Sequence, residues 1–176
     1  MKQLAILAAL AVALPAYAQS GAPLRAALHG YQEVPAVSTV AMGEFEARVA
    51  NDGLSVDWTL VYDGLQGGVQ QAHIHFGQKS VNGTIVVWLC GTAGFAGPTG
   101  TQTCPGQGGR LTGTITAANV VTQTSAGGIA QQLTTGELAE LIDAMRSGVA
   151  YVNVHSTISP GGEIRGQIGA RGHSGK

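Results

Sequence analysis

The sequence predicts an all-β fold, a Greek-key-like β-sandwich or barrel with one short helix late in the chain, at about residues 135–147. Three observations predict it. Short runs of alternating apolar and polar residues recur along the chain. Turn signals rich in Gly, Asn, Asp and Pro separate these runs about every ten residues. Only one stretch has helical periodicity, so the core should lie between sheet faces.

The best strand signal is LSVDWTLVYDGL, residues 54–65, where Trp58 is expected on the buried face together with Leu60 and Tyr62. MGEFEARVA (42–50) alternates in the same way, with Phe45 on its apolar side. TIVVWLC (84–90) is almost continuously apolar, which is typical of a central strand, and RLTGTITAANV (110–120) is a further strand candidate. Together these segments predict a β domain with a single core.

The predicted helix lies in TTGELAELIDAMRSG, residues 134–148. Thr134 and Glu137 have the spacing of a capping box, and Gly148 stands where a helix C-terminus favours glycine. Apolar residues recur at i, i+3, i+4 and i+7, so one face of the helix should pack on the core. These residues are Leu138, Leu141, Ile142 and Met145.

The N-terminal segment resembles a secretory leader, which predicts a secreted or periplasmic protein. A basic Lys2 precedes an apolar run and then Ala16-Tyr17-Ala18, so cleavage is expected after Ala18; a membrane anchor is the alternative. We expect a signal peptide at 1–18, one β domain at 24–168 and a disordered tail at 169–176 that includes His173. No other stretch is apolar enough to cross a membrane.

The charge balance argues against nucleic-acid binding. Loss of Lys2 with the leader leaves 8 of the 9 basic side chains against 10 acidic ones. Such a chain has no basic footprint for DNA, RNA or anionic lipid.

Two cysteines, Cys90 and Cys104, flank a long loop rich in Gly, Pro and Thr at 91–109. An even cysteine count in an exported chain favours a disulfide, and two free thiols are the alternative. Closing a loop of this size would stabilise the fold by roughly 3 kcal/mol.

The histidines pose the functional question. Side chains alternate along a strand, so in AHIHF (72–76) His73 and His75 share the face opposite Ala72 and Ile74. AYVNVHS (150–156) and GEIRGQI (162–168) have similar polar faces, and a hairpin-length connection makes these two strands antiparallel neighbours. If the 72–76 strand lies beside them, the three histidines converge. The polar residues concerned are His73, His75 and His155, with Tyr151, Asn153, Glu163, Arg165 and Gln167 around them.

Three interpretations of this polar face remain open, and all three place it at the surface. Three neutral imidazoles can hold copper or zinc. Alternatively, His75 or His155 pairs with Glu163 in a hydrogen-bond network, or one histidine serves as a general base. No Gly-x-Ser-x-Gly elbow accompanies Ser156, so acyl transfer is not supported. Glu33, before Val34-Pro35, is interpreted as a buried strand-edge residue, and His29 as a strand-end residue.

Three segments in order resemble the CHRD domain, which is named from chordin and also occurs in secreted bacterial proteins. They are GYQEVPAV (30–37), GLQGGVQQAHIHFGQKSVNGTIVVWL (64–89) and SGVAYVNVHSTISPGGEIRGQI (147–168). Ala36 departs from the family, which often has proline there. The resemblance implies a secreted all-β domain. In chordin such domains belong to a protein that binds extracellular growth factors, which a lone bacterial-type copy need not do; the partner expected here is a protein or small extracellular ligand.

AHIHFG is also locally similar to copper–zinc superoxide dismutase, in which a His-x-His strand supplies copper ligands. This chain has no histidine between His75 and His155, so the bridging ligand of that family is absent. We therefore expect a non-catalytic binding or structural domain, and the alternative is a copper or zinc protein, either a copper carrier or a dismutase-like enzyme.

Overall fold

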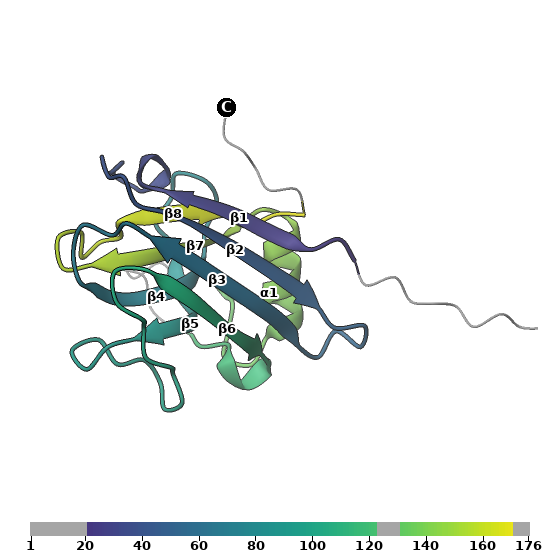
Figure 1. Ribbon diagram of the computed structural model, residues 1–176. Helices are drawn as coiled ribbons and strands as arrows, with labels where there is room; N and C mark the ends of the chain where they lie inside the picture. The colour runs from purple at the N-terminus through teal and green to yellow at the C-terminus, as the bar shows by residue number, and fades with distance from the viewer. Residues whose placement is uncertain (1–20, 123–130, 171–176) are drawn as a thin grey trace, which may run out of the picture.

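The computed structural model describes residues 21–122 and 131–170, which form an antiparallel sheet curled into a nearly closed barrel (Figure 1). Across the sheet the strand order is β5-β4-β7-β8-β1-β2-β3-β6. The strands are β1 (Leu24–His29), β2 (Met42–Val49), β3 (Val56–Asp63), β4 (Val69–Phe76), β5 (Thr84–Gly91), β6 (Gly109–Ile115), β7 (Ala150–Ser156) and β8 (Ile164–Gln167). The predicted all-β class is confirmed.

Alternation in the sequence becomes burial in the barrel. β3 alternates between buried and exposed residues along most of its length, and Trp58 is buried as predicted, with its ring stacked on Phe45 at 6.4 Å between centroids. β1, β2 and β3 follow one another as antiparallel neighbours, and β6 adds to the free side of β3. Their apolar sides face those of β4, β7 and β8 across one core.

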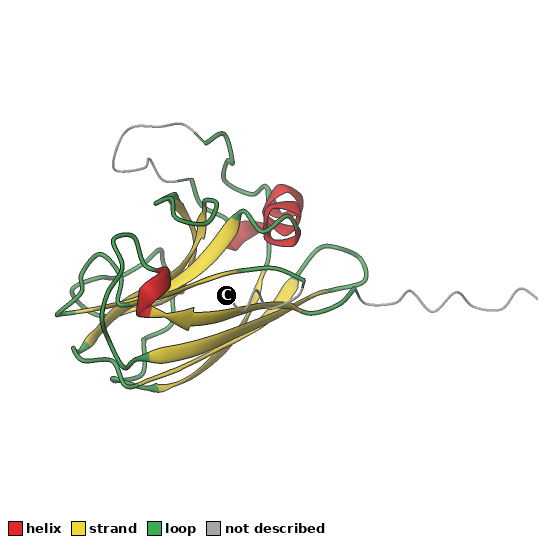
Figure 2. Cartoon of the chain, turned by 90° about the horizontal axis from the view of Figure 1, so that it is seen from above, coloured by secondary structure: helices red, strands yellow, loops and turns green. Residues whose placement is uncertain are grey.

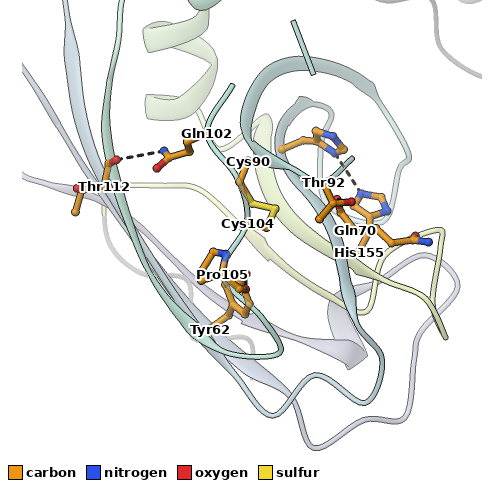
Figure 3. The surroundings of a disulfide bond; sticks show 10 residues. Tyr62, Gln70, Cys90, Thr92, Gln102, Cys104, Pro105, Thr112 and His155 are labelled. Atoms are coloured by element: carbon orange, nitrogen blue, oxygen red, sulfur yellow. Dashed lines mark hydrogen bonds between the residues drawn. A yellow bond between two sulfur atoms is a disulfide. The ribbon is translucent and has the colours of Figure 1, made fainter. Parts of the chain in front are cut away.

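The sheet ends at β5 and β6, and the segment between these strands helps to close the barrel. Cys90 at the end of β5 forms a disulfide with Cys104, which confirms the predicted pairing (Figure 3). The Cys104 N–H also donates to Gly91 O, and Val121, in the segment after β6, donates its N–H to Val86 O on β5. The cross-link therefore holds the long 92–108 loop against the open side of the barrel.

The helix α1 (Leu138–Arg146) is the single α-helix within the described residues (Figure 2). It lies within the predicted range and buries the predicted apolar face. Gly148 ends it at a φ of +72°, a left-handed conformation that glycine adopts without strain. At the other end the expected capping box is wrong: the N-cap is Glu137 and no side chain caps the helix, although the Thr134 N–H does donate to the Glu137 carboxylate before the helix begins.

The expected leader at 1–18 lies outside the described residues, as do residues 171–176 of the expected tail, including His173. In the described part of the chain, no helix is long and apolar enough to cross a membrane.

Candidate metal centre

The sheet brings His73, His75 and His155 together. β7 pairs with β8, as the hairpin connection predicted, and β4 pairs with β7, which meets the condition for the histidines to converge. His73 lies opposite Asn153 and His75 lies opposite Tyr151, while His155 lies opposite Gln71. One nitrogen from each of the three rings lies within 4.8 Å of the others. That spacing allows a single ion to contact all three.

The expected surface position of this cluster is wrong, because the three imidazoles are buried. Their exposed fractions are 0 % for His73, 8 % for His75 and 6 % for His155. Alternation correctly placed them opposite the apolar core, but loops from distant parts of the chain cover this second face. The 77–83 loop reaches over His75, and Asn82 from that loop donates to Val34 O in the β1–β2 connection. The β7–β8 turn covers His155 through Pro160.

Two backbone carbonyls fix the orientation of two of the rings. The Nδ1–H of His75 donates to Gly83 O at 3.0 Å, and the Nδ1–H of His155 donates to Pro160 O at 2.8 Å. A neutral imidazole that donates through Nδ1 carries its lone pair on Nε2. Metal-ligating histidines usually make this second contact, which sets the tautomer and the ring orientation. Both Nε2 atoms are therefore poised as ligands.

Hydrogen-bond acceptors lie close together inside the histidine cluster. His155 Nε2 lies 3.1 Å from Asn153 Oδ1 and 3.3 Å from His73 Nδ1. A proton on His73 Nδ1 would satisfy His155 Nε2 and leave the Asn153 oxygen facing a lone pair. His75 Nε2 and His73 Nε2 are buried without a hydrogen-bond partner. Each unpartnered buried polar atom costs about 1–3 kcal/mol, and a cation at the centre would remove part of that cost.

Burial keeps the imidazoles neutral. Burial, together with the charges of the neighbouring His155 and His75, lowers the pKa of His73 to about 2. Burial lowers the pKa of His75 to about 3, although the Gly83 carbonyl partly opposes the effect. It also lowers the pKa of His155. The neutral form is the one that binds a metal.

An aromatic and cationic stack adjoins the cluster. The Tyr151 ring lies parallel to the His75 ring, with centroids 4.6 Å apart, and the Arg165 guanidinium carbon lies 3.4 Å from the Tyr151 centroid. Arg165 is held by Val81 O and Gln78 O of the covering loop and by Asn82. Arg165 thus ties this loop to the sheet and places a fixed positive charge one ring, that of Tyr151, away from His75. On the opposite side, Trp88 of β5 meets His73 edge-on at 4.3 Å between centroids.

Glu33 is the site residue that the sequence did not identify as such. It is buried, as expected, but it lies at the polar face: its carboxylate and the Asn153 amide both lie against Gly162, and its Oε1 is buried without a hydrogen-bond partner. Burial raises the pKa of Glu33 to about 7, and the Arg165 charge partly opposes the shift. The β7–β8 turn passes so close that a Cβ on Gly162 would collide with the carboxylate. The only available signal was Val34-Pro35, which indicates extended backbone and no proximity to β7.

Two other predicted neighbours lie away from the imidazoles. The Glu163 carboxylate accepts hydrogen bonds from Thr39, Ser156 and the Gln66 N–H. Gln167 Nε2 contacts the backbone carbonyls of Gly77, Gly148 and Ala150. No hydrogen bond joins Glu163 to His75 or His155 among the described residues, so the network interpretation lacks its expected pair. His29 ends β1 and contacts Gln32.

The family profile of the CHRD domain matches residues 24–168. The chain belongs to the CHRD domain family. Comparison with curated proteins and with solved structures gave no match. The matched segment of this CHRD protein includes all eight strands, the disulfide and the three histidines.

Proposed function

We propose that this CHRD-domain protein is an exported, non-catalytic protein that binds a copper or zinc ion through His73, His75 and His155. The observation that carries the proposal is the pair of Nδ1–H donations to Gly83 O and Pro160 O, which leaves two Nε2 lone pairs directed into one buried cluster. Three imidazoles are a common ligand set for both metals.

Burial of the cluster supports holding an ion over turning over a substrate. A catalytic zinc or copper centre keeps a position open for water or substrate. Here the rings lie under the 77–83 loop and the Pro160 turn, and at most 8 % of any of the three residues is exposed. A dismutase-like activity is the less favoured alternative, because superoxide would have to reach the ion.

The disulfide is compatible with export, because such bonds persist mainly in oxidising compartments. The leader-like segment at 1–18 supports the same proposal, with the β domain at 24–168 as the folded unit. The physiological partner would be a protein or small extracellular ligand, or the metal alone.

Elemental analysis and isothermal titration of tag-free protein at pH 7.5 test the metal proposal. We expect about one Cu(II) or Zn(II) per chain, and each His→Ala change at positions 73, 75 and 155 should weaken affinity by at least about tenfold, or 1.4 kcal/mol. Cu(II) should bind more tightly than Zn(II), an order that is general for such ligands. His29→Ala is the matched control, because His29 lies at the end of β1 outside the cluster.

The result that would reject the proposal is equal affinity of the wild type and the His73→Ala, His75→Ala, His155→Ala triple variant. Circular dichroism of each variant separates loss of ligands from loss of fold.

A further inference from the structure

The candidate centre supplies no negative charge of its own. Its ligands are three neutral imidazoles, and no carboxylate or thiolate belongs to the ligand group found among the described residues. Glu163, which could have served as a fourth ligand, is turned toward Thr39 and Ser156. An ion bound here therefore retains its full charge inside the protein.

That charge would lie in a poorly solvated place. His73, His75 and His155 are buried, and the ring edge of Trp88 and the face of Tyr151 line two sides. The cost of moving an ion out of water rises with the square of its charge, so a dication costs about four times as much as a monocation of similar size.

The buried guanidinium of Arg165 increases the difference in binding cost between a dication and a monocation. Arg165 is 1 % exposed and stacks on Tyr151, which stacks in turn on His75. Its repulsion of a bound ion doubles when the ion charge doubles. Glu33 is the buried acid whose charge interacts with Arg165; its carboxylate lies against Gly162 and offsets this repulsion only while it is ionised.

The presence of only three protein ligands also favours a monovalent ion. Zinc centres with three protein ligands add a water as the fourth, and Cu(II) prefers a tetragonal arrangement. Cu(I) has a closed shell and imposes no such geometry, so three nitrogens from one sheet face can satisfy it.

We infer that the centre is selective for monovalent copper and holds Cu(I) in preference to Zn(II) and Cu(II). This inference rests on the proposed metal-binding function and specifies its ion. A bound copper would stay reduced in air longer than free Cu(I), because the protein stabilises the lower charge.

The test is a set of competition titrations on chelator-treated, tag-free protein at pH 8. Cu(I) affinity is measured without oxygen against bicinchoninate, and Zn(II) and Cu(II) affinities against chromophoric chelators of known strength. We expect the Cu(I) dissociation constant to be at least about a hundredfold below that of Zn(II). The reduction potential of the bound copper, measured by redox titration, should lie above that of aqueous copper.

Glu33→Gln tests the electrostatic reasoning without touching a ligand. The change removes the carboxylate charge beside Arg165, so Cu(II) affinity should fall by about threefold or more beyond any fall in Cu(I) affinity, and the potential should rise. Glu44→Gln is the matched control, because Glu44 is exposed on β2 and should leave both affinities unchanged.

The possible outcomes separate the two ideas. If none of the three ions binds, the proposed function itself is rejected. If all bind but Zn(II) binds as tightly as Cu(I), the metal centre stands and the inference of Cu(I) selectivity is overturned. If Glu33→Gln shifts both copper affinities equally in a folded protein, the charge argument is wrong.

Discussion

Acidification of the metal-free protein should lower its free energy of unfolding, and the buried imidazoles set the size of the effect. His73 and His75 have pKa values of about 2 and about 3 in the folded protein, against 6.5 for an unperturbed imidazole. Below pH 6.5 the unfolded chain therefore binds protons that the folded protein does not, and stability falls as the pH falls. The stabilising contribution is complete above pH 6.5 and is lost progressively toward pH 3.

Glu33 acts in the opposite direction over part of this range. Its pKa is about 7 when folded and 4.5 otherwise, so the folded protein binds the extra proton between these values and gains stability as the pH falls. Each fully titrating group changes the free energy of unfolding by about 1.4 kcal/mol per pH unit. Between pH 6.5 and 4.5, protonation of His73 and His75 in the unfolded chain lowers the free energy of unfolding, and Glu33 offsets about one of these two groups. His155 adds up to one more group, so the net loss in the free energy of unfolding is about 2–5 kcal/mol. That is a large share of the 5–15 kcal/mol typical of a domain.

Urea titrations of chelator-treated protein at pH 7.5, 6.5, 5.5 and 4.5, followed by tryptophan fluorescence, measure this slope. Two variants should shift it in opposite directions. His73→Gln removes a destabilising proton site and should make the slope shallower by about 1.4 kcal/mol per pH unit, and Glu33→Gln should make it steeper by a similar amount. A free energy of unfolding that stays constant or rises from pH 6.5 to 4.5 would refute the assignment of neutral, buried imidazoles.

Three further predictions concern the core, the cross-link and the leader. Trp58→Ala should lower the free energy of unfolding by about 3–5 kcal/mol in a denaturant titration, because Trp58 is buried against Phe45; a loss below about 1 kcal/mol would contradict that position. Reduction of Cys90–Cys104 should raise the mass by about 2 Da and lower stability by about 3 kcal/mol, whereas labelling of both thiols without reductant would disprove the bond in the purified protein. Exported protein should begin at Gln19 by mass spectrometry, and an intact Met1 on exported material would contradict cleavage.

Local pattern was sufficient to predict the strand faces and one of the strand pairings. Period-two alternation placed Trp58 in the core and gave His73 and His75 a common face, because a strand leaves its side chains no other geometry. The short connection from β7 to β8 predicted their antiparallel pairing. Whether β4 joined them depended on contacts between residues about eighty positions apart, which no local pattern contains.

The covering of the polar face could not be predicted for the same reason. Asn82 reaches Val34, and Arg165 reaches Val81, so two loops remote in sequence close over the imidazoles. The same closure moves Glu33 from an apparent strand-edge position to the side of Asn153. Burial reverses the electrostatic expectation as well, because a surface histidine titrates near pH 6.5 and these do not.

The bound metal should also stabilise the folded domain. Orphaned ring nitrogens on His73 and His75 cost about 1–3 kcal/mol each, so the empty cluster destabilises the sheet that builds it. An ion that binds only the folded chain, present at a thousand times its dissociation constant, stabilises that chain by about 4 kcal/mol. The two quantities are similar in size, so saturating copper should offset the cost of burying the cluster.

Thermal melts with and without Cu(I), in the absence of oxygen, measure this stabilisation. We expect a rise in Tm of about 8 °C or more in the wild type and none in a folded His75→Ala, His155→Ala variant. An equal rise in both proteins would mean that copper stabilises the domain at some other place, and the three imidazoles would then be a purely structural cost.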